Sequence, residues 1–175
     1  MPNHSFNKDK SLSALLFICE GLGGDIDLYS LLKILYFAEQ KHLVKYGRSI
    51  TGDSIIAMQY GPVPSSSYNL VKPTPANKMY FYFGEQNIIT CKIKSDMDFL
   101  SESDINCLSE SILENKDLSF RLIKDKSHEK SYEKAWAKEK NSVIPYIDIA
   151  IDGGASEELV KYIALNIENE NLIIE

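Results

Sequence analysis

Apolar residues recur every three or four positions along most of the chain, a period typical of helices with one buried face. One such helix is predicted to begin with Ser11 as its cap and to end at the glycines in 21–24. A longer helix is predicted from Asp25 or Asp27 to Tyr46. This second helix is apolar on nearly every side, which indicates a central helix buried against several neighbours.

The later helices are shorter. Serines 65–67 offer caps for a brief helix that ends near Lys72, and Ser101-x-x-Asp104 is typical of a capping box at the start of another. Helical spacing predicts three more helices, over 118–126, over 128–140 and after Gly153-Gly154.

Aromatic and β-branched residues predict a β-hairpin over 79–93, with its loop at 84–87. Residues 54–60 read as an extended segment that runs into a Gly-Pro-Val-Pro turn at 61–64, because two prolines so spaced cannot lie inside a helix. The predicted fold class is therefore mainly α (α+β): a compact helical domain around a central buried helix, with a small antiparallel β-hairpin.

The length of 175 residues suits one domain. We expect a flexible N-terminus over 1–10, the domain over 11–150, and an acidic C-terminal helix and tail over 151–175, packed on or appended to that domain. An apolar connector is predicted over 147–151. Residues 151–175 hold six acids and one lysine, so they carry −5 of the formal net charge of −6.

The other 150 residues are nearly balanced in charge, which argues against nucleic-acid binding by this chain alone. Cys19, Cys91 and Cys107 form no CxxC pair and are predicted to be buried free thiols. No apolar run approaches ~18 residues, and the first ten residues are polar. We therefore expect a cytoplasmic protein without a membrane partner.

No phosphate loop, dinucleotide fingerprint or HExxH zinc motif is present, and three scattered histidines do not form a zinc set. One of them, His4, is expected in a frayed terminus. The sequence thus predicts no enzyme, no cofactor and no metal. A hydrolase remains the least favoured alternative: His42, Asp53 and one of serines 65–67 could form a triad, although no nucleophile elbow surrounds those serines.

A second alternative is a winged-helix-like DNA-binding regulator. A helix, a glycine turn, a second helix and a later hairpin follow one another in the order of that fold. A recognition helix needs polar side chains for the groove, whereas residues 31–38 are mostly apolar. The helix is therefore poorly suited to reading DNA.

Several segments in order along the chain match the motifs of a known family. KILYFAEQKHL at 33–43 is similar to its KLLYLAxxxHL helix, and YGRSITGD at 46–53 to its GxPLTGD turn. AMQYGPVPS at 57–65, with Tyr68, is similar to AxxxGPVPxxxY, and the LSESD and Ser127-His128 to Ala135-Trp136 elements also correspond. Over about residues 11–140 the chain thus resembles the Panacea domain, also called SocA-like and found in the phage-associated group GepA.

The resemblance implies an antitoxin of a type II toxin-antitoxin system, which neutralises a cognate toxin protein by direct protein–protein binding. The SocA branch of the family also acts as an adaptor that delivers its toxin to a Clp-type protease. The hairpin and the acidic tail depart from the family pattern and are candidates for partner-specific parts. The identity of the toxin, the stoichiometry and the oligomeric state stay open.

Tyrosines around the proline turn and on the hairpin are candidates for partner contact, because tyrosine combines apolar area with a hydroxyl group. In the hairpin, alternation predicts that Phe81 and Phe83 face the body while tyrosines 80 and 82 face outward. The predicted partner-binding residues are Tyr60, Gly61, Pro62, Pro64, Tyr68, Tyr80 and Tyr82.

A second set of residues is predicted to be structural: Tyr36, His42, Asp53, His128 and Trp136. The proline turn is expected to form a rigid platform over the central helix near two of them, Tyr36 and His42. Trp136 is expected to belong to the core.

Overall fold

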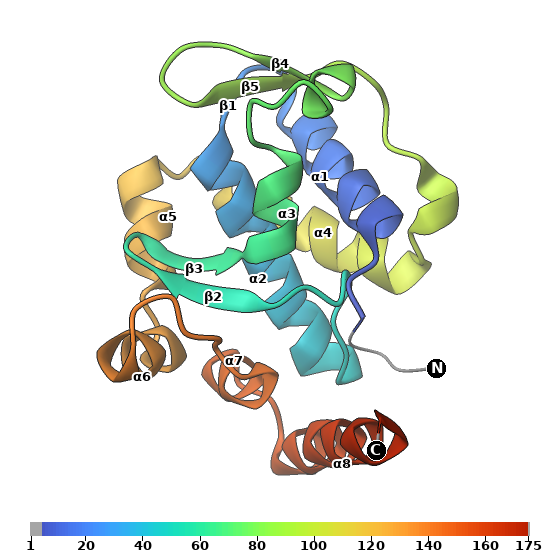
Figure 1. Cartoon of the computed structure of the whole chain (residues 1–175), viewed down its shortest axis with the longest axis vertical. Coiled ribbons are helices and arrows are strands. Elements are labelled where there is room, and N and C mark those ends of the chain that lie inside the picture. The colour runs from blue at the N-terminus through green and yellow to red at the C-terminus, as the bar shows by residue number, and fades with distance from the viewer. Residues whose placement is uncertain (1–4, 175) are drawn as a thin grey trace.

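The computed structural model describes residues 5–174, with side chains through residue 169, so His4 lies outside the described residues. Helices form most of the molecule, and two small antiparallel sheets accompany them (Figure 1). The predicted mainly α (α+β) class is confirmed. The elements are α1 (Lys8–Leu22), β1 (Ile26–Asp27), α2 (Leu28–Tyr46), β2 (Ile55–Met58), β3 (Gly61–Pro64), α3 (Ser65–Leu70), η1 (Asn77–Met79), β4 (Phe81–Phe83), β5 (Ile88–Cys91), η2 (Met97–Phe99), α4 (Glu102–Asn115), α5 (Phe120–Ser127), α6 (Lys130–Lys138), α7 (Tyr146–Asp152) and α8 (Glu157–Ile174).

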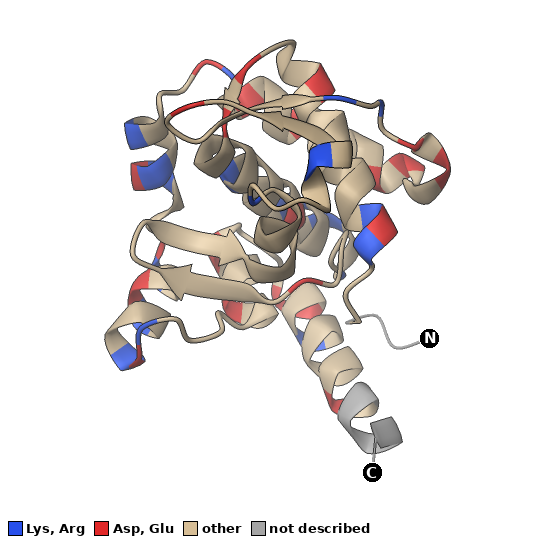
Figure 2. Ribbon diagram, turned by 45° about the horizontal axis from the view of Figure 1, so that its top comes forward, with Lys and Arg blue, Asp and Glu red and all other residues tan. Residues whose placement is uncertain are grey.

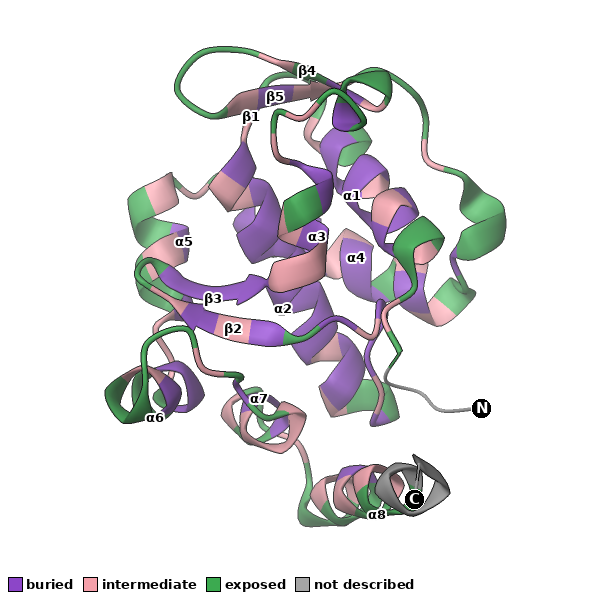
Figure 3. Ribbon diagram, viewed as in Figure 1, coloured by how far each residue is buried: buried purple, intermediate pink, exposed green. Residues whose placement is uncertain are grey.

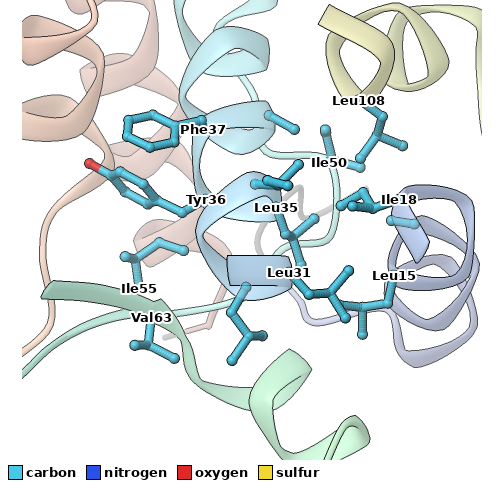
Figure 4. Close-up of a cluster of buried hydrophobic side chains, with 14 of the residues drawn as sticks. Leu15, Ile18, Leu31, Leu35, Tyr36, Phe37, Ile50, Ile55, Val63 and Leu108 are labelled. Carbon is cyan, nitrogen blue, oxygen red and sulfur yellow. The ribbon is translucent and has the colours of Figure 1, made fainter. Parts of the chain in front are cut away.

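Helix α2 is the centre of the fold. Its start is capped by Asp27, whose carboxylate accepts from the backbone N–H of Ser30 at 2.8 Å, and it ends at Gly47 in the left-handed conformation. Thirteen of its 19 residues are buried, and it contacts α1, α4, α5, α7 and β3 (Figure 3). Leucines and isoleucines of α1, α2 and α4 meet on one side of α2, and Ile55 and Val63 pack on another (Figure 4). The expectation of a central buried helix is confirmed.

Helix α1 begins earlier than predicted. Its cap is Asn7, whose side chain accepts from the N–H of Lys10 at 3.0 Å, so three residues assigned to a flexible terminus are helical. The backbone N–H of Asn7 also donates to Thr51 O at 2.9 Å. Ser11, the predicted cap, is buried inside the helix, where its hydroxyl lies 2.8 Å from that of Ser67. Tertiary hydrogen bonds position this start, and apolar spacing does not reveal them.

The predicted hairpin is present as β4 and β5, with Phe81 opposite Cys91 and Phe83 opposite Ile89. Its first strand is shorter than predicted, because residues 77–79 form a 3₁₀ turn. Strand β1 pairs with the other edge of β5 and completes a three-stranded sheet. Two residues are too few to show an alternating pattern, so the sequence did not predict this strand.

The Gly-Pro-Val-Pro segment is a strand and not only a turn, which corrects the prediction. It forms β3 and pairs with β2, Ile55 lying opposite Pro64 and Ala57 opposite Pro62. The backbone N–H and C=O groups of Ile55 and Ala57 point away from β3 and bond to the segment at 141–144. For example, the N–H of Ile144 donates to Ile55 O at 2.8 Å. Prolines are tolerated at positions 62 and 64 of β3 because these positions donate no N–H hydrogen bond to β2.

The predicted apolar connector at 147–151 is instead part of α7. Its residues Ile149 and Ala150 are fully buried, and α7 packs between α2 and α8. Helix α8 follows, with Ile163 buried, and it lies at the opposite end of the molecule from the hairpin (Figure 1).

Candidate functional site

Many polar residues of the sequence motifs bond to backbone inside the fold. Glu39 is the clearest case: its carboxylate accepts from Ser49 Oγ at 2.8 Å, from Ile50 N at 2.7 Å, and from Thr51 N and Oγ1 at 3.0 and 2.5 Å. Burial raises the pKa of Glu39, while these donors act in the opposite direction. Sequence reasoning missed Glu39, although it is the one acid in the sequence of this central helix and was a usable signal.

Asp53 caps α3 from outside the helix. Its carboxylate accepts from the N–H groups of Ser66 and Ser67 at 3.0 and 2.7 Å and from Ser67 Oγ at 2.7 Å. The serines at 65–67 therefore do not cap this helix, whose N-cap position is Pro64. The sequence placed the cap wrongly because Asp53 reaches these groups only through the β2–β3 hairpin.

His42 lies near the start of α4. Its Nδ1 donates to Arg48 O at 2.7 Å, and its Nε2 lies 3.1 Å from Ser103 Oγ and 3.3 Å from Asp104 Oδ1. Burial lowers its pKa, which favours the neutral imidazole. Asp53 is bonded to α3 and not to His42, so the considered triad does not form. His42 is thus bonded to Arg48 and to the start of α4.

The turn that joins β2 to β3 is fixed by two side chains. Lys33 Nζ of α2 donates to Pro62 O at 2.7 Å, and the Tyr132 hydroxyl of α6 donates to Met58 O at 2.9 Å. Between these contacts lies Gly61, with φ at +102°. Side chains of α2 and α6, which are distant in sequence, thus converge on residues 58–62.

Gly61 has no room for a side chain. A Cβ placed there would lie 2.7 Å from Lys33 Nζ, 2.8 Å from Ser127 Oγ and 3.1 Å from His128 Cδ2. We call Lys33, Ser127, His128 and Tyr132 the turn cluster. It explains why separate sequence motifs belong together: they meet around Gly61.

His128 precedes α6 and is the C-cap residue of α5, whereas the sequence predicted it inside a helix. Its ring centroid lies 4.5 Å from that of Tyr132, which stacks on Trp136 at 6.2 Å. Trp136 is half-buried and packs against the core, and Lys140 Nζ lies 5.7 Å from its ring. Tyr132, which bonds to the turn, is thus flanked by the rings of His128 and Trp136.

An aromatic pocket of about 250 Å³ opens beside the same turn, between α2, α3, α5 and the β2–β3 hairpin. Four rings line it in succession, with centroid separations of 6.4 Å for Tyr60 to Phe120 and 6.1 Å for Phe120 to Tyr29 and Tyr29 to Tyr68. Tyr60 is 51% exposed at the tip of the turn. The remaining lining residues are Leu32, Lys33, Met58, Gln59, Val63 and Asn141.

The structure brings only part of the predicted partner-binding set together. Tyr60 and Tyr68 line the aromatic pocket, whereas Gly61, Pro62 and Pro64 are buried and form the strand beneath it. Sequence reasoning missed Tyr29, Lys33 and Phe120 as pocket residues. On α2 the signal was available, because residues 29, 32 and 33 share one helix face.

Tyr82 lies in β4 of the other sheet, and Tyr80 directly precedes that strand. Tyr82 is 59% exposed with Lys92 Nζ 5.1 Å from its ring, and Phe81 is buried, as alternation predicted. Tyr80 is half-buried and packs against the core. It ends the 3₁₀ turn before the strand, so the strand alternation does not extend to it.

The element that would read DNA in a winged helix is α2, and its burial keeps it out of any groove. Lys and Arg are interspersed with Asp and Glu along the ribbon (Figure 2). Among the described residues, no group of three His, Cys, Asp or Glu could hold a metal ion. No helix in the described part of the chain is both long enough and apolar enough to span a membrane. Of the three free cysteines, Cys19 and Cys107 are buried and Cys91 is half-buried.

A family model described as antitoxin SocA-like, Panacea domain, matches residues 31–137, well over half of the chain. The match begins within α2 and ends just after Trp136, so it includes the whole turn cluster and most of the aromatic pocket. No curated protein and no solved structure matches the chain.

Proposed function

The chain belongs to the family of SocA-like antitoxins with a Panacea domain, and from this membership we propose that it is a type II antitoxin that binds and neutralises a cognate toxin protein. The observation that carries the proposal is the aromatic pocket. Partly exposed tyrosines around a concave, mostly apolar surface are the usual composition of interface hot spots. A toxin side chain inserted there would lose its water contacts and gain aromatic neighbours.

The frame of the pocket supports this role. The turn cluster fixes the β2–β3 turn through the bonds of Lys33 and Tyr132, and Gly61 permits their close approach. A surface that is already ordered before binding loses less conformational entropy on association. The binding surface is therefore largely preformed.

The β4–β5 hairpin extends this proposed binding surface. The backbone N–H of Leu28 donates to Asn87 O at 2.9 Å, which places the β4–β5 loop beside the start of α2 and close to Tyr29. Tyr82, exposed on the same hairpin, is the second contact that we propose. The hairpin would then contribute to partner choice, and the aromatic pocket would supply most of the affinity.

The test is a binding isotherm between the purified chain and the protein encoded by the neighbouring gene. Tyr60→Ala is expected to weaken binding at least about tenfold, since ~1.4 kcal/mol suffices, without lowering the melting temperature. Tyr162→Ala in α8 is the control, because Tyr162 is 50% exposed but far along the chain from the pocket. Unchanged affinity in Tyr60→Ala would refute the pocket as the toxin site.

Delivery of the toxin to a Clp-type protease is the further step that SocA-like membership suggests. It is tested by the half-life of the toxin with purified protease, with and without this chain. Faster turnover only in the presence of the chain would support an adaptor role. An unchanged half-life together with tight binding would leave neutralisation by binding alone.

A further inference from the structure

Lys33 is unusual among the residues that line the aromatic pocket. It lies on the central helix, is 2% exposed, and donates from Nζ to Pro62 O at 2.7 Å. Among the described residues, no carboxylate lies within ion-pair distance of this amine, and its pKa is lowered to about 7 by burial. A buried ammonium is rarely left without an anionic partner, because desolvation of the charge is costly.

A second basic group, His128, also lies next to Gly61. The Nε2 atom of His128 is buried and has no hydrogen-bond partner. Burial, and after it the charges of Lys33 and Lys124, lower the pKa of His128, while Asp125 acts in the opposite direction. Asp125 itself lies 3.5 Å from Lys124 Nζ, with its carboxylate 56% exposed. In the described part of the chain, neither Lys33 nor His128 of the turn cluster forms an ion pair with a carboxylate.

The walls beside Lys33 suit an apolar stem. Leu32, Met58 and Val63 contribute aliphatic surface, and the four rings surround the opening. The volume of about 250 Å³ is below the ~300–1,000 Å³ typical of drug-sized ligand sites, so the pocket fits one side-chain-sized group. An occupant with an apolar stem and an anionic end would match both the walls and the amine.

We propose that the group which the partner protein inserts into the aromatic pocket carries a carboxylate that pairs with Lys33. The proposal rests on the proposed function, because it names the chemistry of the partner at that same site. The ammonium is already desolvated in the free protein, so its desolvation is part of the folding free energy. Only the carboxylate has to lose water on binding, which removes half of the usual cost of forming a buried ion pair.

The test uses two compounds of the same shape, 3-phenylpropionate and the neutral 3-phenylpropanamide, with the full-length chain. At about pH 6 the carboxylate is ionised and Lys33 is mostly protonated. NMR titration should show the carboxylate binding at least about tenfold more tightly than the amide. Equal affinities, tighter binding of the amide, or no binding of either compound would overturn the proposal.

Two variants assign the effect. Lys33→Met should abolish the preference for the carboxylate while the amide affinity stays unchanged, whereas a preference that persists would exclude Lys33 as the anion contact. Tyr60→Ala leaves Lys33 in place and should lower the affinity for both compounds equally. If Lys33→Met does not fold, the other two measurements still test the proposal. The proposal requires that the wild-type chain binds the carboxylate more tightly than the amide, and that Tyr60→Ala weakens the binding of both compounds.

Failure of this inference is distinguishable from failure of the proposed function. If Tyr60→Ala weakens toxin binding but the two compounds bind alike, the toxin site stands and the carboxylate is excluded. If the carboxylate compound binds more tightly but Tyr60→Ala leaves the affinity for the toxin unchanged, the pocket is a site for small carboxylates. That second result would overturn the assignment of the carboxylate to the partner protein.

Discussion

Buried polar side chains in this protein contact backbone more often than they contact one another. Glu39 accepts from two backbone N–H groups, Asp53 from two more, and His42 donates to a backbone carbonyl. Each of these side chains satisfies buried backbone groups that have no partner in a helix or sheet. At the residue scale, the motif positions near α2 therefore serve the fold.

Glu39→Gln should destabilise the protein by about 2–3 kcal/mol. A carboxylate can accept all four bonds, whereas the amide of glutamine turns an NH₂ group toward donors and leaves them unpaired. Urea denaturation measures the change in unfolding free energy. Glu139→Gln, at an exposed position, is the matched control and should change stability by less than ~0.5 kcal/mol. Equal stability of the two variants would contradict the role of Glu39.

Lys33 should make stability depend on pH. Its pKa is about 7 in the fold and ~10.4 in an unfolded chain, so between these values the unfolded state binds more protons and stability rises with pH. Below pH 7 the full cost of burying the charge is present. Relative to Lys33→Met, the wild type should gain about 2 kcal/mol between pH 7 and pH 9. Urea denaturation of both proteins at the two pH values measures this, and parallel pH profiles would contradict it.

At the scale of elements, the β2–β3 hairpin and the β4–β5 hairpin differ in how they attach to the helical body. The first is fixed by side chains of α2 and α6, as the bonds of Lys33 and Tyr132 show. The second packs through Phe81 and pairs with β1 at its outer edge. Each attachment predicts a different sensitivity to substitution.

Three glycines separate the effect of space from that of backbone conformation. Gly61→Ala combines a positive φ with contacts below 3.0 Å and should cost about 3 kcal/mol or more. Gly23→Ala has a positive φ in open space and should cost about 1–2 kcal/mol. Gly24→Ala has neither constraint and should be neutral or slightly stabilising. Thermal melts give the order, and a Gly61 variant as stable as the Gly24 variant would refute the crowded turn.

In the second hairpin, neighbouring residues should behave in opposite ways. Phe81→Ala removes a ring that is 1% exposed and should cost about 3–5 kcal/mol. Tyr82→Ala, at 59% exposure, should change stability by no more than ~0.5 kcal/mol while it weakens toxin binding. Melting curves and binding isotherms on both variants provide the measurement. Reversed stabilities would mean that the two faces of the strand are assigned wrongly.

At the scale of the whole molecule, α8 and the aromatic pocket occupy different parts of the fold. Helix α8 packs on α7 and on the end of α2, where Leu159 and Tyr162 lie against Gly47. The aromatic pocket is lined by α2, α3, α5 and the β2–β3 hairpin and by no residue of α8. Residues 151–175 hold six of the 25 acids but carry −5 of the formal net charge of −6, because they contain one lysine.

A chain that ends at Ala155 should therefore fold with a lower melting temperature, because Ile163 and its neighbours no longer cover α7. Its affinity for the toxin should stay within about twofold of the full-length value. Circular dichroism and a binding isotherm test both statements. Loss of toxin binding in a truncated chain that remains folded would instead assign partner contact to the acidic tail.

The sequence by itself determined the features that depend on neighbouring residues. The long helix that begins at Asp25 or Asp27 and ends at Tyr46, the Ser101–Asp104 capping box and the inward face of Phe81 follow from local spacing, and the structure places the cap of that helix at Asp27. The family motifs were also recognisable along the chain, and the match over 31–137 confirms the family. Periodicity and caps act within a few residues, so they are visible in a linear sequence.

Only the tertiary structure decided which side chains share a site. The cap of α3 comes from Asp53, the start of α1 is bonded to Thr51, and β1 reaches β5 across more than 60 positions. The aromatic pocket likewise combines Tyr29, Tyr60 and Phe120 from three segments whose own patterns resemble ordinary core. Long-range pairing is chosen by the packing of the whole chain around α2, and no local pattern records which distant groups will meet there.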